Sequence, residues 1–592
     1  MKRDLILSDN QRYLKSKNPL LFIGDWCLLK HPEEILSKLD YKICTSHTFK
    51  NIDRKMKYDV CENIFLSIIK DFKKNLNNLH QTSYSLRGWE IIAGEWLRRF
   101  IYICLDRFEL LNKACKDYEI KEIFAVNVDS YEFSTKDTGG IYYASIDDQW
   151  NHALYSKILK FYKFNNKISY FEINEKYLKN QIVFSGFNKD RKLTKMKIAE
   201  FVMNIFTKFK SENDGFIFDS YLPFFYEKQL ELSLKQFPQL WKTKNINFKS
   251  YDNNLRQKIS FDYENYTDIE KFIRYMLPIS IPICLIESFS DILHISNNSD
   301  YPKNPKFIFT SCAYDQDEIF KLYAANKVDA GVPFYIGQHG NGNHSLIDNN
   351  YVSELNTCTK YLTWGMKKYS KDIPMFNFKT LGRKKLFKKD GYFTIVVRSL
   401  GYRAKPYDRY LESTKNIKST TEIIKKLNLK IKKMTLLRLH HSFLSRGNLI
   451  TEKYFKNLKI KIDFGRKSLR NILKDTRVTL FNYDSTGLLE NLALNIPSVC
   501  YWDDTYNHLN PEFVNRYNLL VEAKILFTKE EDLIKHLNNY WDNINDWWLD
   551  SLTEKKIKEF NDNFNIRGDE ESFRKLSSIF KGIKRDDIYP LW

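Results

Sequence analysis

The segment 476–502 contains residue types that could bind a phosphate group. An apolar run, Val478–Phe481, predicts a buried strand, and a helix is predicted from Leu488 to Leu494. The turn between them holds small and hydroxylated residues, namely Ser485, Thr486 and Gly487. A helix N-terminus presents unpaired N–H groups and the positive end of the helix dipole, so a phosphate at this turn would meet hydrogen-bond donors. Glu490, one turn into the helix, could accept a hydrogen bond from a ribose hydroxyl. The alternative is an ordinary helix cap that binds nothing.

A second candidate is a glycine-rich loop that follows the predicted strand 333–338. The loop begins with Gln338, His339 and Gly340 and contains a further histidine, His344. The carboxyl ends of parallel strands face the ligand crevice of a sheet, so Gln338 and His339 are expected at its edge. Glycines let backbone N–H groups come close to a ligand. The alternative is a tight turn with a capping histidine.

Two more loops could contact the phosphates of a nucleotide. The predicted strand Thr435–Leu439 ends in His440 and His441, which favours a phosphate contact, a structural role or a metal site. Adjacent residues of a strand point in opposite directions and no acidic partner lies nearby in the sequence, which disfavours the metal. The loop after the strand 392–399 contains Arg403, which could hold a diphosphate or could be a solvated charge.

A fifth candidate could supply a general base. Asp147 and Asp148 are followed by His152, and a carboxylate or an imidazole in a cleft can take the proton of an acceptor hydroxyl. Asp148 and His152 are therefore the predicted bases. The alternative is that one of the two acids caps the helix Trp150–Leu159.

The segment 476–502 resembles the donor-site signature of GT-B glycosyltransferases, in particular those of bacterial capsule and lipopolysaccharide synthesis. With the segments Thr310–His344 and Asp147–Leu154 added, the chain resembles, nearly end to end, a family of transferases encoded in O-antigen gene clusters. The resemblance implies transfer of a sugar from a nucleotide-activated donor to a surface polysaccharide or O-antigen acceptor. Sialic-acid and Kdo transferases are similar, which implies a CMP-linked nonulosonic or Kdo-like donor and places His440 against its phosphate.

The same resemblance assigns roles to the other candidates. It implies donor binding by Gln338, His339, Gly340, Ser485, Thr486, Gly487 and Glu490, to which the residues themselves add Arg403. His339 is also a catalytic candidate beside Asp148 and His152. Relatives favour glycine where this chain has Asn341, and they favour His-Pro where this chain has His440 and His441. No metal is expected, because N–H groups and histidines would stabilise the charge on the departing phosphate without a divalent ion. No cofactor is expected, because the nucleotide-sugar is a substrate. The alternatives are a CDP-glycerol-like polyol-phosphate transferase and a non-catalytic scaffold of polysaccharide assembly.

The composition predicts a large intracellular protein. A chain of 592 residues is long enough for two or more domains, and nine scattered cysteines indicate neither a disulfide framework nor a zinc site. The N-terminus lacks the apolar core of a signal peptide, and the most apolar segment, Leu277–Ile286, is too short to span a membrane. We therefore expect a cytoplasmic protein.

The net charge of +21 is compatible with solvated lysines, with attraction to an anionic membrane surface that carries lipid-linked acceptors, or with nucleic acid. No nucleic-acid motif is found, and no nucleic-acid partner is expected. The expected partners are the nucleotide-sugar, the lipid-linked or oligosaccharide acceptor and, peripherally, the inner face of the membrane.

Strands that alternate with helices predict an α/β fold with two Rossmann-like doubly wound domains that face a cleft, with helical additions. A basic stretch at 383–391 divides the chain into an acceptor-side domain, 1–385, and a nucleotide-binding domain, 386–592. Residues 84–111 predict a long helix with buried aromatic side chains. The resemblance further implies that the terminal helices return to the first domain.

Overall fold

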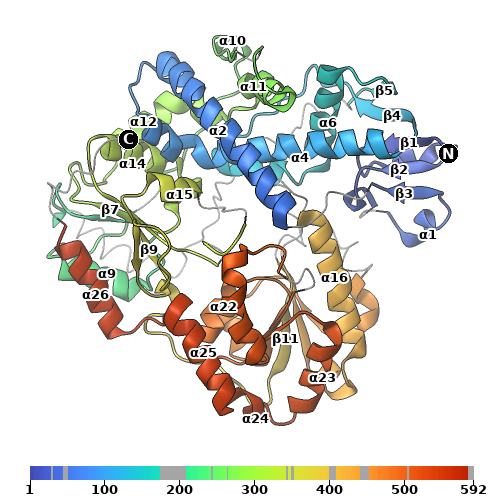
Figure 1. Cartoon of the computed structure of the whole chain (residues 1–592). Helices are drawn as coiled ribbons and strands as arrows, with labels where there is room; N and C mark the ends of the chain where they lie inside the picture. The colour runs from blue at the N-terminus through green and yellow to red at the C-terminus, as the bar shows by residue number, and fades with distance from the viewer. Residues whose placement is uncertain are drawn as a thin grey trace.

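The computed structural model describes residues 1–28, 31–44, 51–173, 209–241, 244–262, 264–341, 344–347, 352–398, 409–440, 451, 454–502 and 506–583. In these parts of the chain the strands form three separate sheets, and every pairing between their strands is parallel where its register is given (Figure 1). The predicted α/β class with Rossmann-like topology is confirmed.

The first sheet has the order β3-β2-β1-β4-β5. Its strands are β1 (Arg3–Ile6), β2 (Leu20–Phe22), β3 (Tyr41–Ile43), β4 (Ile120–Val126) and β5 (Lys167–Phe171). Its main helices are α1 (Glu33–Leu36), α2 (Asn51–His80), α3 (Leu86–Trp89), α4 (Glu95–Asp117), α5 (Ile141–Ala144) and α6 (Asp148–Tyr162). A π-helical turn, Glu90–Gly94, joins α3 to α4, so the long helix predicted over 84–111 is confirmed, with one wide turn inside it.

The second sheet has the order β10-β9-β8-β7-β6. Its strands are β6 (Phe216–Ile217), β7 (Ile308–Thr310), β8 (Phe334–Gly337), β9 (Lys360–Thr363) and β10 (Asp372–Pro374). The helices around it are α9 (Phe224–Ser233), α10 (Asn253–Arg256), α11 (Asp268–Ser280), α12 (Phe289–Asn297), α13 (Ala313–Gln316), α14 (Glu318–Asp329) and α15 (Val352–Thr357).

The third sheet has the order β13-β12-β11-β14-β15-β16. Its strands are β11 (Tyr392–Val396), β12 (Thr435–Arg438), β13 (Lys461–Asp463), β14 (Thr476–Phe481), β15 (Ser498–Tyr501) and β16 (Leu526–Phe527). Its helices are α16 (Arg409–Lys426), α17 (Leu429–Lys433), α20 (Leu469–Leu473), α21 (Thr486–Ala493), α22 (Pro511–Glu522), α23 (Glu530–Tyr540), α24 (Asn545–Trp548) and α25 (Ser551–Phe564). The chain order 3-2-1-4-5-6 is that of a dinucleotide-binding Rossmann sheet.

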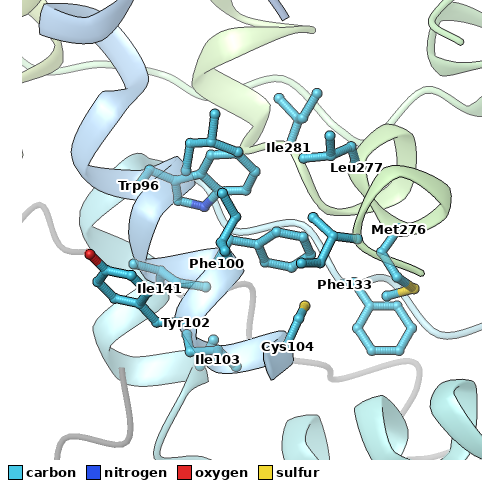
Figure 2. Close-up of a cluster of buried hydrophobic side chains, with 14 of the residues drawn as sticks. Trp96, Phe100, Tyr102, Ile103, Cys104, Phe133, Ile141, Met276, Leu277 and Ile281 are labelled. Carbon is cyan, nitrogen blue, oxygen red and sulfur yellow. The ribbon is translucent and has the colours of Figure 1, made fainter. Parts of the chain in front are cut away.

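One continuous hydrophobic core joins the first two sheets. Helix α4 supplies its central aromatic side chains, of which Trp96 and Phe100 stack with ring centroids 5.3 Å apart. Figure 2 shows them near Met276 and Leu277 of α11 and near Ile281. A second core lies in the third sheet and its helices.

The last helix, α26 (Glu570–Lys581), returns to the second sheet, where Phe580 stacks on Phe307 at 4.6 Å. The expectation that the terminal helices return to the earlier part of the chain is confirmed for α26, whereas α23 and α24 pack in the core of the third sheet.

The sequence predicted one domain over residues 1–385, and the structure places two sheets there. The first sheet was missed as a sheet, because β1, β4 and α2 were not predicted. The predicted division at 385/386 lies between β10 and β11, and it stays a prediction. No helix in the described residues is long and apolar enough to cross a membrane.

Candidate active site

The turn between β14 and α21 lies at the topological switch point of the third sheet. β11 pairs with β12 on one side and with β14 on the other, so the connections after β11 and β14 run to opposite sides. Ligands of open α/β sheets bind outside the carboxyl ends of the strands at such a point. Ser485 is the N-cap of α21, and its side-chain oxygen accepts a hydrogen bond from the N–H of Gly487 at 3.1 Å. In this structure Ser485 therefore acts as a helix cap, which was the alternative prediction for this turn.

Thr486 connects this turn to the second sheet. Its hydroxyl donates to the Asn341 side-chain oxygen at 2.9 Å and accepts from the Asn341 backbone N–H at 3.1 Å. Asn341 follows the strand β8, so the loops after β8 and β14 meet. Segment 344–347 makes a further contact, since the Ser345 carbonyl accepts from the N–H of Asn510 at 2.7 Å. The carboxyl ends of strands in two different sheets are therefore held together.

Gln338 shapes the loop after β8 and is almost completely buried. Its amide nitrogen donates to the Gly340 carbonyl at 2.8 Å, and its amide oxygen accepts from the Trp364 N–H at 2.8 Å. Gly340 thus takes part in the loop through its carbonyl group. Because these contacts hold Gln338 and Gly340, they also fix the backbone position of His339, which lies between the two residues in the sequence.

His339 lies just beyond the carboxyl end of β8, the central strand of the second sheet, with 21% of its side chain exposed. Its Nδ1 is 3.5 Å from the Tyr314 hydroxyl and 3.7 Å from the carboxylate of Glu354. The Tyr314 hydroxyl donates to Glu354, whose second oxygen accepts from Tyr361 at 2.9 Å. Burial lowers the pKa of His339 to about 4, with Asp315 opposing and Lys379 adding to the effect. The imidazole is therefore neutral near pH 7, as a general base must be.

Glu490 also spans the two sheets. Its carboxylate lies 3.3 Å from the ammonium group of Lys379 and 3.7 Å from the guanidinium of Arg383, both of which follow β10. A ribose hydroxyl at Glu490 would share that carboxylate with two cations. Its predicted contact with ribose stays a prediction.

Two arginines at the switch point were not among the predicted site residues. Arg438 is the last residue of β12, and Arg398 follows β11. Burial raises the pKa of the intervening Tyr483, and a hydrogen bond with Ser485 and the charges of Arg398 and Arg438 oppose it. The guanidinium carbon of Arg398 lies 5.8 Å from the centroid of the Tyr483 ring. Nε of Arg438 is buried and makes no hydrogen bond within the described residues.

The signal that could have identified Arg438 is its place at a strand end, two residues before His440. His440 itself follows the carboxyl end of β12, which pairs with β11. Arg403 and His441 lie outside the described residues. The phosphate contacts predicted for His440 and Arg403 therefore stay predictions.

The predicted bases Asp148 and His152 lie in α6, next to the first sheet. Asp147 caps α6 by accepting from the Trp150 N–H at 2.8 Å, and Asp148 accepts from the Asp9 N–H at 2.9 Å. The capping alternative thus describes Asp147. His152 is 4% exposed, and its Nε2 lies 3.0 Å from the Phe124 carbonyl of β4. Burial lowers its pKa to about 4. This geometry favours a core role for His152, and its role as a base stays a prediction.

His344, the second histidine of the loop after β8, pairs with Asp372 and, among the described residues, not with the turn before α21. Its Nε2 is 2.9 Å from the Asp372 carboxylate, and the side chain is buried. Among the described residues, no three His, Cys, Asp or Glu side chains come together as ligands for a metal ion.

Comparisons with known proteins identify a transferase family. A family model described as "LIC12162 family transferase" matches residues 3–577. A comparison with curated proteins finds no match. Among solved structures, MurG of Acinetobacter baumannii is 9% identical with a TM-score of 0.27, and the alignment covers 49% of this chain and 77% of that one.

Two further structures are similar at the same level. An O-GlcNAc transferase mutant of Thermobaculum terrenum is 10% identical with a TM-score of 0.28, over 54% of this chain and 60% of that one. The wall teichoic acid polymerase TagF is 10% identical with a TM-score of 0.32, over 65% of this chain and 95% of that one. Likenesses this distant carry no argument about the reaction of this chain.

Proposed function

The chain belongs to the LIC12162 family of transferases, and we propose that it transfers a glycosyl group from a nucleotide-activated sugar to a surface polysaccharide or O-antigen acceptor, as a GT-B type glycosyltransferase. One observation carries the proposal. The cap of α21, at the switch point of a Rossmann sheet, is hydrogen-bonded through Thr486 and Asn341 to the histidine loop of a second parallel sheet. A donor bound at the switch point would lie beside a loop that can act on an acceptor.

The third sheet would bind the nucleotide. The turn at Ser485, Thr486 and Gly487 and the positive end of α21 favour an anion, which would compete with the Ser485 hydroxyl for the Gly487 N–H. Arg398 and Arg438 add two guanidinium groups, which form strong charge-assisted hydrogen bonds with phosphate oxygens. His440 and Arg403 are proposed beside them, and Glu490 is proposed near the ribose. Together these groups would stabilise the charge that develops on the departing phosphate, and we propose that no metal ion is required.

The second sheet would supply the base. Asp148 and His152 were predicted for this role, but they contact Asp9, which follows β1, and Phe124 of β4 in the first sheet. His339 is the better candidate, because it is partly exposed and its loop contacts Thr486 through Asn341. Gln338 and Gly340 hold that loop in place.

The resemblance to sialic-acid and Kdo transferases supports a CMP-linked nonulosonic or Kdo-like donor. A cytoplasmic location is part of the proposal, and the net charge of +21 supports contact with lipid-linked acceptors at the anionic inner face of the membrane. A phosphodiester in the product would contradict glycosyl transfer and favour the polyol-phosphate alternative.

A thermal-shift screen with CMP, CDP, UDP, GDP and dTDP tests the donor site. A nucleotide at 100 times its Kd should add about 2.7 kcal/mol of apparent stability. Arg438→Gln should weaken binding by roughly 1.5–3 kcal/mol, the usual contribution of a charged hydrogen bond. Arg477→Gln is the matched control, because Arg477 lies near the amino end of the same sheet, 4.9 Å from the centroid of the Trp541 ring.

A shift with cytidine nucleotides, lost in Arg438→Gln and kept in Arg477→Gln, is the expected result. Equal shifts with UDP or GDP would overturn the cytidine preference. Failure of every nucleotide to bind would favour the non-catalytic scaffold.

A further inference from the structure

A hydrogen-bonded chain runs from His339 into the protein interior. Nδ1 of His339 faces the Tyr314 hydroxyl at 3.5 Å, and that hydroxyl is hydrogen-bonded to Oε1 of Glu354. Glu354 is completely buried in α15, and its Oε2 accepts from the Tyr361 hydroxyl of β9 at 2.9 Å. The chain therefore connects a partly exposed imidazole with a buried carboxyl group.

Such a chain has two consistent directions, because a tyrosine hydroxyl both donates and accepts. When Glu354 is ionised, Tyr314 donates to it, and His339 can donate from Nδ1 to the Tyr314 oxygen. When Glu354 is protonated, it can donate to Tyr314, and Tyr314 can donate to Nδ1. The second direction leaves the ring proton of a neutral His339 on Nε2.

We propose that Glu354 and Tyr314 are positioning residues that determine which ring nitrogen of His339 carries the proton. The proposal deepens the role of His339 in the proposed function and rests on it. Because Nδ1 faces the chain, a proton from a substrate must be accepted at Nε2. Nε2 has a lone pair only when the proton is on Nδ1, so the base is active when Glu354 is ionised.

With its proton on Nδ1, His339 can accept the proton of the acceptor hydroxyl during glycosyl transfer. The O–H bond of the acceptor breaks, and its proton moves to Nε2 of His339. The acceptor oxygen forms a bond with the anomeric carbon of the donor, while the bond from that carbon to the phosphate oxygen breaks. The electron pair of that bond leaves on the phosphate, which the cations of the third sheet stabilise.

The surroundings of Glu354 favour its protonated form over a wide pH range, so we expect the tautomer of His339 that can accept a proton at Nε2 to become populated only as the pH rises. Burial raises its pKa well above the usual range, and the carboxylates of Glu95 and Asp315 add to this effect, whereas the hydroxyls of Tyr314 and Tyr361 oppose it. No lysine or arginine of the described residues forms an ion pair with Glu354. Among the described residues, Glu354 forms an ion-pair contact with His339, at 3.7 Å.

The nearby cations are engaged by other groups. Arg99 of α4 pairs with Asp315 of α13 at 2.7 Å and with Glu95 at 3.1 Å. Arg98 pairs with Glu62 and Glu90 and donates to the Ser353 hydroxyl, next to Glu354 on α15. Lys371 donates to the Leu355 carbonyl at 3.1 Å. Cys358 and Cys312 are further titratable neighbours, since burial raises the pKa of each thiol and the charge of Glu354 adds to the effect. The π-helical turn Glu90–Gly94 places Glu90 and Glu95 around this cluster, and wide turns of this kind are frequent at functional sites.

The tautomer of His339 can be measured in the free protein by ¹⁵N NMR of the histidine side chains, from about pH 5 to about pH 10. We expect the ring to stay neutral and its proton to move from Nε2 to Nδ1 as the pH rises and Glu354 ionises. In Glu354→Gln and in Tyr314→Phe the tautomer should not change with pH. Tyr361→Phe is the matched control, since it removes a hydroxyl from the same carboxylate on the side away from Nδ1.

Tyr361→Phe should keep the change of tautomer and move its midpoint to higher pH, because one donor to the ionised carboxylate is lost. One tautomer at every pH in the wild type would overturn the proposal, and so would a Tyr314→Phe protein that behaves like the wild type. The dispersion of the remaining histidine signals reports whether each variant is folded. The NMR experiment contains no nucleotide or acceptor, so its result is independent of the nucleotide screen. If only the screen fails, the tautomer result still holds, but the proposed function loses its nucleotide-sugar donor.

Discussion

Replacing His152 with glutamine distinguishes a core histidine from a catalytic base. In the folded protein, Nε2 of His152 contacts the Phe124 carbonyl at 3.0 Å, and the ring lies edge-on to Tyr13 with centroids 5.6 Å apart. A glutamine amide can donate to the same carbonyl and does not titrate. The variant therefore keeps the contact and removes the ionisation.

The size of the effect follows from the pKa, which burial lowers from 6.5 to about 4. The unfolded chain takes up the proton first as the pH falls, so the contribution of His152 to stability is fully present above pH 6.5 and is lost towards pH 4. The loss amounts to about 2 kcal/mol at pH 5 and to roughly 3 kcal/mol below pH 4. For a cooperative unit of 150–250 residues, a loss of 2 kcal/mol lowers the melting temperature by about 4–8 °C.

The assay is a comparison of melting temperatures at pH 7 and pH 5 for the wild type and His152→Gln. We expect the variant to lose less stability on acidification, by about 2 kcal/mol. His294→Gln is the control, because His294 is exposed on α12, and it should follow the wild type. The same acid-induced loss in His152→Gln as in the wild type would refute the reasoning. Loss of transferase activity in a folded His152→Gln protein would restore His152 as a catalytic base.

Two other predictions separate binding from folding and test the need for metal. The double change Ser485→Ala/Thr486→Ala should weaken nucleotide binding by roughly 1–3 kcal/mol and lower stability by about 1 kcal/mol through loss of the cap, so the protein should remain folded. Unchanged affinity in the folded variant would show that the motif only caps α21 and joins it to Asn341. Transfer activity should survive excess EDTA. Loss of turnover that Mg²⁺ or Mn²⁺ restores would contradict the metal-independent mechanism and point to Asp147 and Asp148 as metal ligands.

The third sheet was predictable because its signals are local. β14 is an apolar run that ends in a polar turn, and a cap and a helix follow within a few residues. Strand, turn and cap preferences act over this distance. The predicted strands Tyr392–Ser399 and Thr435–Leu439 correspond to β11 and β12 for the same reason.

The first sheet was not predictable in this way, because its central strand contains buried charges. β1 has the sequence RDLI, and all four residues are buried. Arg3 reaches the Leu20 carbonyl at 3.1 Å and the Asp40 carboxylate at 3.0 Å, and Asp4 accepts from Ser16 and Asn18. These partners satisfy the charges only after β2 and its neighbours have assembled. A hydropathy pattern therefore shows a polar N-terminus where the structure has a core strand.

In the candidate site, too, the residues with local sequence signals were predictable and those defined by distant contacts were not. The sequence identified Ser485 and His339 from their own loops, whereas the contact of Thr486 with Asn341 joins residues 145 positions apart. Glu354 lies in a short helix of ordinary composition, and its importance comes from Tyr314 and Tyr361, which other elements bring to it. A histidine motif shows that an imidazole is present but not which nitrogen can accept a proton. That property depends on the groups behind the ring, so a mechanism for His339 has to be argued from the three-dimensional contacts of Glu354 and Tyr314.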